Sequence, residues 1–106
     1  MAWFFLFVAG ILEIVWAYSM KLSDGFTRPW PTAVTIVAMI CSFALLSFAM
    51  RALPLGTAYM VWTGIGAVGA FVVGVLVLGE AATPGRLVAA GLIVSGIVLM
   101  KLSSDA

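Results

Sequence analysis

Four long apolar segments dominate this chain of 106 residues and limit what it can fold into. They cover approximately residues 3–20, 32–50, 56–78 and 85–101, and short polar stretches separate them. Each has 17–23 residues, and an α-helix of about 20 residues spans the hydrocarbon core of a bilayer. The pattern predicts an all-α integral membrane protein, in which residues 1–106 form a single domain of four transmembrane helices.

The composition supports a membrane protein and excludes several other classes. The chain is 65% hydrophobic and 8% charged, whereas a soluble domain has about 25% charged residues. A net charge of +1 without a basic patch argues against nucleic-acid binding. The single cysteine, Cys41, excludes an internal disulfide and a cysteine-based metal site. No nucleotide-binding loop or metal-ligand cluster is present in the sequence, so we expect no enzyme activity and no cofactor other than protons as a coupling ion.

Glu13 is the only acidic residue inside any apolar segment. A charge near the middle of a bilayer costs roughly 2.5–3.5 kcal/mol on insertion scales, so an acidic residue there indicates a function. Its own chain offers no cation at that depth, because Lys21, Arg51 and Lys101 all lie near the ends of segments. We therefore expect Glu13 to belong to a cation pathway, and a second copy of the chain to bring a second carboxylate into one cavity.

Helical spacing places several residues on the same face of the first segment as Glu13. Gly10 and Ala17 are small and leave room for a ligand, and Trp16 stands one turn away. A tryptophan in a membrane span usually packs or faces lipid, but its register with Glu13 favours a place in the site.

Few other polar side chains occur at membrane depth. Ser42 lies near the middle of the second segment, and Tyr59, Trp62 and Thr63 are expected on one face of the third. A buried hydroxyl or indole N–H needs a partner, and a carboxylate is the strongest acceptor available. Two alternatives remain open: Ser42 could bond its own helix backbone, and the two aromatic residues could be anchors at the membrane surface.

These groups together describe a site for a small organic cation, because aromatic faces attract cations while carboxylates supply charge. The same carboxylates can hold protons or a cation but not both well. Such exclusion, at a site open to each side of the membrane in turn, predicts a proton/cation antiporter.

Glycines mark the third and fourth segments. Gly64, Gly66 and Gly69 indicate either close helix packing or a hinge for alternating access. In the fourth segment Gly91, Ser95 and Gly96 form a small-residue surface typical of helix association, and we expect the dimer interface there.

Charge does not fix the orientation of the chain in the membrane. One side carries Lys21, Arg28 and Arg86, and the other carries Arg51 and Lys101. This difference is too small for the positive-inside rule to decide. Either the first helix decides a single orientation despite the weak charge signal, or copies of the chain insert in both orientations and pair antiparallel.

The sequence resembles the small multidrug resistance transporters over essentially its whole length. The residues that carry the resemblance are Glu13, the loop 21–28, the run 54–66 and the stretch 91–96. Within the family the chain is most similar to the guanidinium-exporter subtype. A tryptophan stands three residues after the glutamate, in Glu13-Ile14-Val15-Trp16-Ala17, and the stretches 62–70 and 78–80 also look like that subtype.

The resemblance implies an antiparallel, dual-topology homodimer in the bacterial plasma (inner) membrane that exports guanidinium-type cations against protons. It assigns substrate and proton binding to Glu13, with Trp16, Ser42, Tyr59 and Trp62 around it. It also implies that the glycines of the third helix form the conformational switch and that the fourth helix forms the dimer contact.

Three alternatives remain. A quaternary-ammonium or multidrug exporter of the same fold would accept bulky cations, which have no N–H donors for the carboxylates. The chain could also pair with a paralogue rather than with itself. A non-transporting membrane subunit would not need Glu13 at all.

Overall fold

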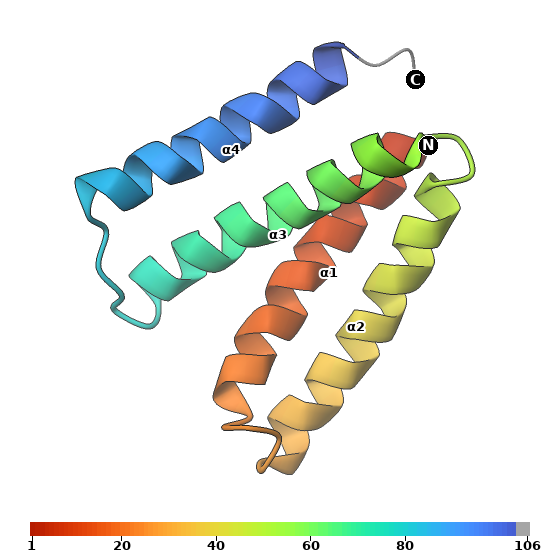
Figure 1. The fold of residues 1–106 in the computed structure, drawn as a ribbon. Coiled ribbons are helices and arrows are strands. Elements are labelled where there is room, and N and C mark those ends of the chain that lie inside the picture. Colours follow the sequence, from red (N-terminus) through yellow and green to blue (C-terminus); the bar gives the residue numbers. More distant parts are fainter. Residues whose placement is uncertain (104–106) are drawn as a thin grey trace.

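The computed structural model describes residues 1–103, and these form four α-helices and no strand (Figure 1). The helices are α1 (Ala2–Leu22), α2 (Pro29–Ala49), α3 (Leu55–Leu76) and α4 (Pro84–Leu102). All four are long and apolar enough to cross a membrane. The helix ends differ by a few residues from those expected: α2 begins at Pro29 rather than at residue 32, and α3 ends at Leu76 rather than at residue 78.

Local chemistry explains these ends. Proline occupies the start of α2 and of α4, where its missing N–H would have no partner within the helix. Thr83 precedes α4, and its side-chain oxygen accepts a hydrogen bond from the N–H of Arg86 at 3.3 Å. After α3 the chain turns at Gly79, whose φ of 73° is a left-handed conformation that glycine adopts without strain.

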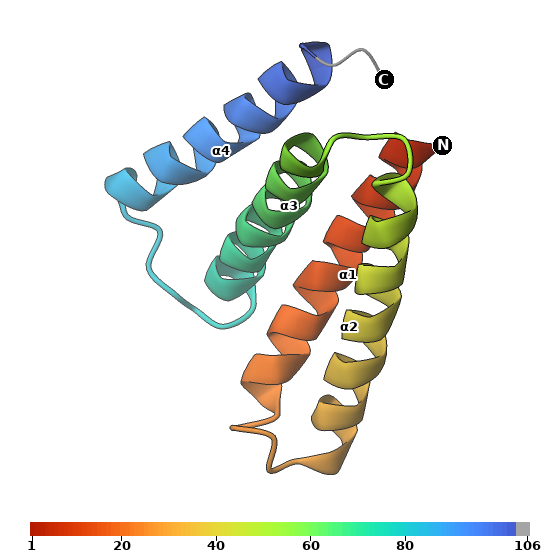
Figure 2. The same cartoon turned by 45° about the vertical axis from the view of Figure 1, so that its right-hand side comes forward.

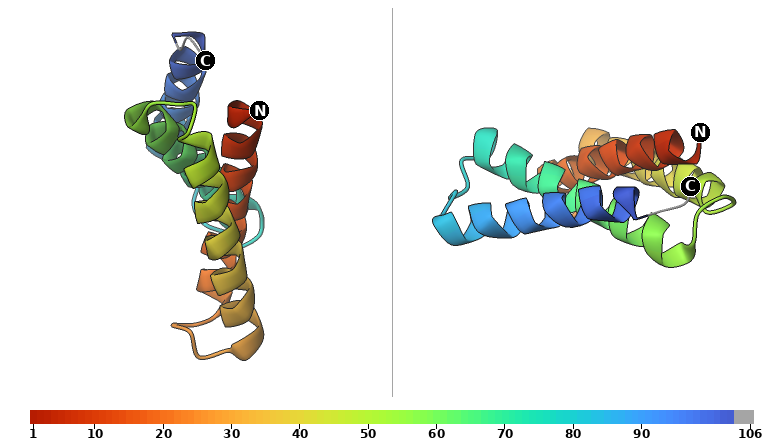
Figure 3. Two further views of the ribbon diagram at one scale, coloured as in Figure 1. Left: turned by 90° about the vertical axis from the view of Figure 1, so that its right-hand side faces the viewer. Right: turned by 90° about the horizontal axis from the view of Figure 1, so that it is seen from above.

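The helices form a flat layer rather than a closed bundle. Along the layer, α1 packs between α2 and α3, while α4 packs along the outer side of α3 and reaches α1 near its end, where the Lys101 ammonium lies over the ring of Trp3 (Figures 1 and 2). The Cα atoms extend over 43 × 34 × 16 Å, and the view from the side shows the thin dimension (Figure 3). One α-helix with its side chains is already about 10–12 Å across. A layer this thin cannot surround a ligand by itself.

The buried core gathers where the start of α1, the end of α2 and the start of α3 meet. It consists of Leu6, Ala9, Leu46, Ala49, Leu53, Ala58, Val61 and Trp62. From there α3 diverges from α1 and α2 (Figure 1). In contrast, α4 contributes no buried residue, and large apolar side chains such as Ile40 and Leu92 are more than half exposed. Apolar exposure on this scale requires lipid or another protein chain as its surroundings.

Candidate cation-binding site

Glu13 lies at the middle of α1, on the side where α1 meets α3. Its side chain is partly buried, and within residues 1–103 its Oε1 atom is fully buried without a hydrogen-bond partner. The carboxylate rests against the backbone of α3 at Gly66, so closely that a side chain at that position would overlap it. A buried carboxylate oxygen without a partner is unfavourable, and a proton on the carboxyl group or a cation beside it would offset this cost.

A chain of two hydrogen bonds connects the three helices one turn before Glu13. The indole Nε1 of Trp62 on α3 donates to Ser42 Oγ on α2 at 3.0 Å, and Ser42 Oγ donates to the carbonyl oxygen of Ala9 on α1 at 2.7 Å. Trp62 is 7% exposed and Ser42 is fully buried. In a regular α-helix the Ala9 carbonyl also accepts the backbone N–H of Glu13. The two bonds therefore fix the backbone of α1 where it carries the acid.

This arrangement differs from the expectation that Ser42 would bond a carboxylate, or else its own helix. The hydroxyl hydrogen is directed to the backbone of a different helix. The physical reason is proximity: Ala9 is small and buried, so α2 can approach the α1 backbone closely at that level.

Four aromatic rings form a row across α1, α2 and α3. Trp16 and Phe43 meet edge to face with ring centroids 6.5 Å apart, Phe43 and Trp62 are 5.7 Å apart, and Trp62 and Tyr59 are also 5.7 Å apart. That Phe43 belongs to this row was not predicted from the sequence. The one sequence feature that could have indicated it is its position directly after Ser42, the polar residue near the middle of the second segment. Rings in this arrangement offer both a water-excluding wall and π faces to a cation.

The smaller residues expected beside Glu13 have different surroundings. The space above Gly10 is filled by Ile65 of α3, because a Cβ atom there would lie 2.6 Å from Ile65 Cγ2. The expectation that Gly10 leaves room for a ligand is therefore wrong in this conformation. Ala17 lines a different space, a groove of about 340 Å³ between the diverging ends of α1 and α3, together with Lys21 and Glu80.

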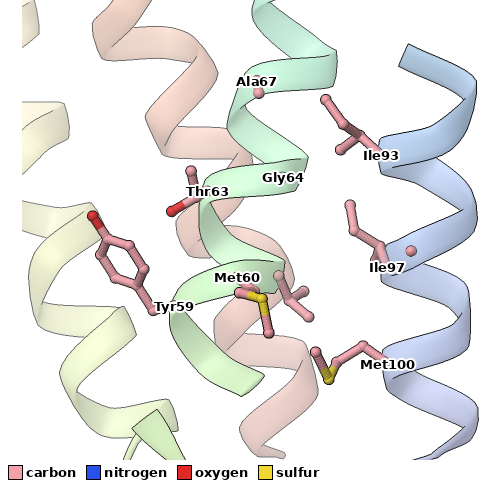
Figure 4. Close-up of a pocket in the computed structure, with 10 residues that line it drawn as sticks. Tyr59, Met60, Thr63, Gly64, Ala67, Ile93, Ile97 and Met100 are labelled. Atoms are coloured by element: carbon pink, nitrogen blue, oxygen red, sulfur yellow. The ribbon is translucent and has the colours of Figure 1, made fainter. Parts of the chain in front are cut away.

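Thr63 does not share the buried face of Trp62. It is exposed and, with the half-exposed Tyr59, lines a groove of about 430 Å³ beside α3 and α4. Figure 4 shows Ile93, Ile97 and Met100 pointing from α4 toward α3 in this groove, with Tyr59 and Thr63 on the side of α3 away from α4. The lining is almost wholly apolar and carries no charge, so it is unsuited to hold a guanidinium-like cation.

The three glycines of α3 each face a side chain of another helix. A Cβ atom at Gly64 would lie 2.8 Å from Ile97 Cδ1 of α4, whereas Gly66 and Gly69 face Glu13 and Ile14 of α1. Over this stretch α3 is continuously helical. Close packing, one of the two interpretations of this pattern, is thus present, and the hinge stays a prediction.

The predicted dimer surface on α4 is uncovered in the single chain. Among residues 1–103, and apart from the backbone of α4 itself, nothing lies within 4 Å of a Cβ atom built at Gly91 or Gly96. The hydroxyl of Ser95 donates to the carbonyl oxygen of Gly91 at 2.8 Å. The role of this surface stays a prediction.

The fold and the site define a small multi-pass membrane protein with a single acid at membrane depth, where the same three helices also carry a row of aromatic rings. The chain matches the family described as "Small Multidrug Resistance protein" over residues 1–93. It is 60% identical to the "Guanidinium exporter" of Citrobacter freundii, 57% to that of Salmonella typhimurium strain LT2 and 55% to that of Escherichia coli strain K12. Each alignment covers 98% of this chain and 99% of the relative. The chain therefore belongs to the small multidrug resistance family, as its motifs predict.

Proposed function

We propose that this protein exports guanidinium and small substituted guanidinium cations across the bacterial inner membrane in exchange for protons. The observation that carries the proposal is the buried, unpartnered Oε1 of Glu13, one turn after Ala9, where two hydrogen bonds join the three helices. Relatives at 55–60% identity that are named as guanidinium exporters support the choice of substrate and of a transporter over an enzyme.

The transporting unit in this proposal is an antiparallel homodimer with dual topology. One chain is a layer whose Cα atoms span only 16 Å in the thin direction, and α4 buries none of its residues. A second copy would enclose the site from the open side and contribute a second Glu13. The nearly balanced positive charges on the two sides of the membrane support insertion in both orientations.

The chemistry of guanidinium suits two carboxylates within aromatic walls. The cation is planar and carries its charge over several N–H donors, so a carboxylate can accept two parallel hydrogen bonds from it. Trp16, Phe43 and Trp62 would exclude water and contact the faces of the cation. A quaternary ammonium ion has no N–H donor and would leave the carboxylate oxygens unsatisfied.

Coupling to protons follows from competition for the same oxygens. A carboxylate that holds a proton has lost the charge that attracts the cation, so each subunit's Glu13 binds protons or substrate alternately. Access to this one site from each side in turn makes the exchange obligatory.

The test is flux in proteoliposomes given guanidinium or tetrapropylammonium, with wild-type protein and with Glu13→Gln, which keeps the side-chain size and removes the charge. We expect flux with guanidinium alone and none in the variant. Flux with both cations would favour the broad quaternary-ammonium exporter. Guanidinium flux that persists in Glu13→Gln would refute the role of the carboxylate, and no flux with either cation would favour a non-transporting subunit.

A further inference from the structure

The crossing of α1 and α3 is built from glycines that each receive a side chain of the other helix. Gly10 of α1 receives Ile65 of α3. Gly69 of α3 receives Ile14 of α1. Between these two apolar contacts, Gly66 receives the carboxylate of Glu13.

The fit at Gly66 involves the charged end of Glu13. A Cβ atom at Gly66 would overlap Oε1 and Cδ of the carboxylate and would lie 2.7 Å from Cγ. Contacts that short do not occur between real atoms, so one side must move if residue 66 gains a side chain. The backbone of α1 is held one turn earlier by the hydrogen bond from Ser42 to Ala9. The flexible part of the contact is therefore the Glu13 side chain.

We propose that Gly66 is a positioning residue for Glu13. Because glycine has no side chain, a space is left beside the α3 backbone at Gly66, and the carboxylate occupies it. We call this space the seat. The length of the side chain at residue 13 and the size of residue 66 together determine where the carboxylate lies. This role is separate from backbone bending, because it depends on the space above Gly66 and not on its conformational freedom.

Two other glycines of α3 serve as matched controls. Gly69→Ala would disturb the same helix crossing, but its contact is the apolar side chain of Ile14. Gly56→Ala adds a methyl group at a position where no other described residue outside the adjacent helix backbone lies within 4 Å. If Gly66 acted only through packing or helix flexibility, a substitution at residue 13 would change the flux and stability of Gly66→Ala no more than those of Gly69→Ala.

The experiment is a double-mutant cycle between residues 66 and 13, read by guanidinium flux in proteoliposomes and by thermal stability in detergent. It uses the wild type, Gly66→Ala, Glu13→Asp and their combination. Aspartate keeps the acid and removes one methylene, which is about the volume that the methyl group of Gly66→Ala adds. The transport readout rests on the proposed function, whereas the stability readout does not.

We expect Gly66→Ala to lower flux at subsaturating guanidinium at least about tenfold, because a small misplacement of a binding group has large effects on rate. Glu13→Asp should lower the flux of the wild type but raise the flux of the Gly66→Ala variant at least about threefold, as expected of residues in direct contact. The melting temperature should fall in Gly66→Ala and recover with Glu13→Asp. It should not recover with Glu13→Gln, whose side chain is as long as that of glutamate. Glu13→Asp should not rescue Gly69→Ala.

Additive effects of Gly66→Ala and Glu13→Asp in both readouts would overturn the proposal, as would wild-type behaviour of Gly66→Ala. If Gly66→Ala alone fails to fold, folding restored by Glu13→Asp supports the seat, and failure of both proteins overturns it. If the wild type moves no guanidinium, the proposed function fails and the stability cycle alone decides the role of Gly66.

Discussion

Ser42→Ala is the sharpest test of how the three helices are held together around the acid. Ser42 is fully buried and takes part in two hydrogen bonds, 3.0 Å from Trp62 Nε1 and 2.7 Å from the Ala9 carbonyl oxygen. Alanine removes both bonds with little loss of volume. The Ala9 carbonyl keeps its partner within α1, so the main cost falls on the indole N–H of Trp62, which is left buried and unpaired.

An unpaired buried donor costs about 1–3 kcal/mol, while hydrogen bonds between membrane helices average about 0.6 and reach about 1.7 kcal/mol. Because one hydroxyl serves two bonds here, we expect Ser42→Ala to lower the free energy of unfolding by about 1–2 kcal/mol. Reversible unfolding in mixed micelles measures this quantity. Ser47→Ala, at an exposed position on the same helix, should stay within about 0.5 kcal/mol of the wild type.

A second comparison isolates the bond to the indole. Trp62→Phe removes the donor, so it should cost less in the Ser42→Ala variant than in the wild type, by about 0.5–1 kcal/mol. If Ser42→Ala costs no more than Ser47→Ala, or if the two substitutions are simply additive, the hydrogen-bonded connection does not contribute to stability and the reasoning is wrong.

Two further contacts give predictions of their own. Phe43→Leu breaks the ring contacts with both Trp16 and Trp62, each worth about 0.5–1.5 kcal/mol, and should lower the free energy of unfolding by about 1–2 kcal/mol; an unchanged value in the same unfolding assay would contradict a packed aromatic row. Lys101→Gln removes the ammonium that lies 4.8 Å from the ring centroid of Trp3, and should lower the free energy of unfolding by about 0.5–1 kcal/mol. Lys101→Arg keeps a positive charge over the ring and should retain most of this stabilisation. Equal losses in the glutamine and arginine variants would show that the charge over the ring does not matter.

The sequence predicted the four helices because length and apolarity alone determine a membrane span. It also singled out Glu13, since an acid at that depth stands out against 65% hydrophobic residues. Positions within one helix were predictable where spacing decides them: Tyr59 and Trp62, three residues apart, do contact each other. Thr63 was placed wrongly because the position directly after Trp62 is turned by about 100° along a helix with 3.6 residues per turn.

The contacts between helices could not be predicted from the sequence. Ser42 bonds to Ala9, 33 positions away, and nothing in the local pattern of either residue specifies that pairing. The space beside Gly10 is filled by Ile65 for the same reason. Both depend on how far each helix slides and rotates against its neighbour, and an apolar surface in an apolar solvent gives little sequence signal for that choice.

The glycines of α3 show why one sequence pattern can carry different physical roles. In the sequence, Gly64, Gly66 and Gly69 are three equivalent small residues. In the structure each meets a different group: the apolar tip of Ile97 on α4, the carboxylate of Glu13, and the apolar side chain of Ile14. If the residues that contact these glycines were ignored, a loss of function on substituting any of the three would be attributed to a stiffer α3. Because the partners differ in charge and in helix, a compensating change in the partner can separate a seat for the acid from a packing contact. Only a defect that no partner substitution repairs is evidence for the bending of α3.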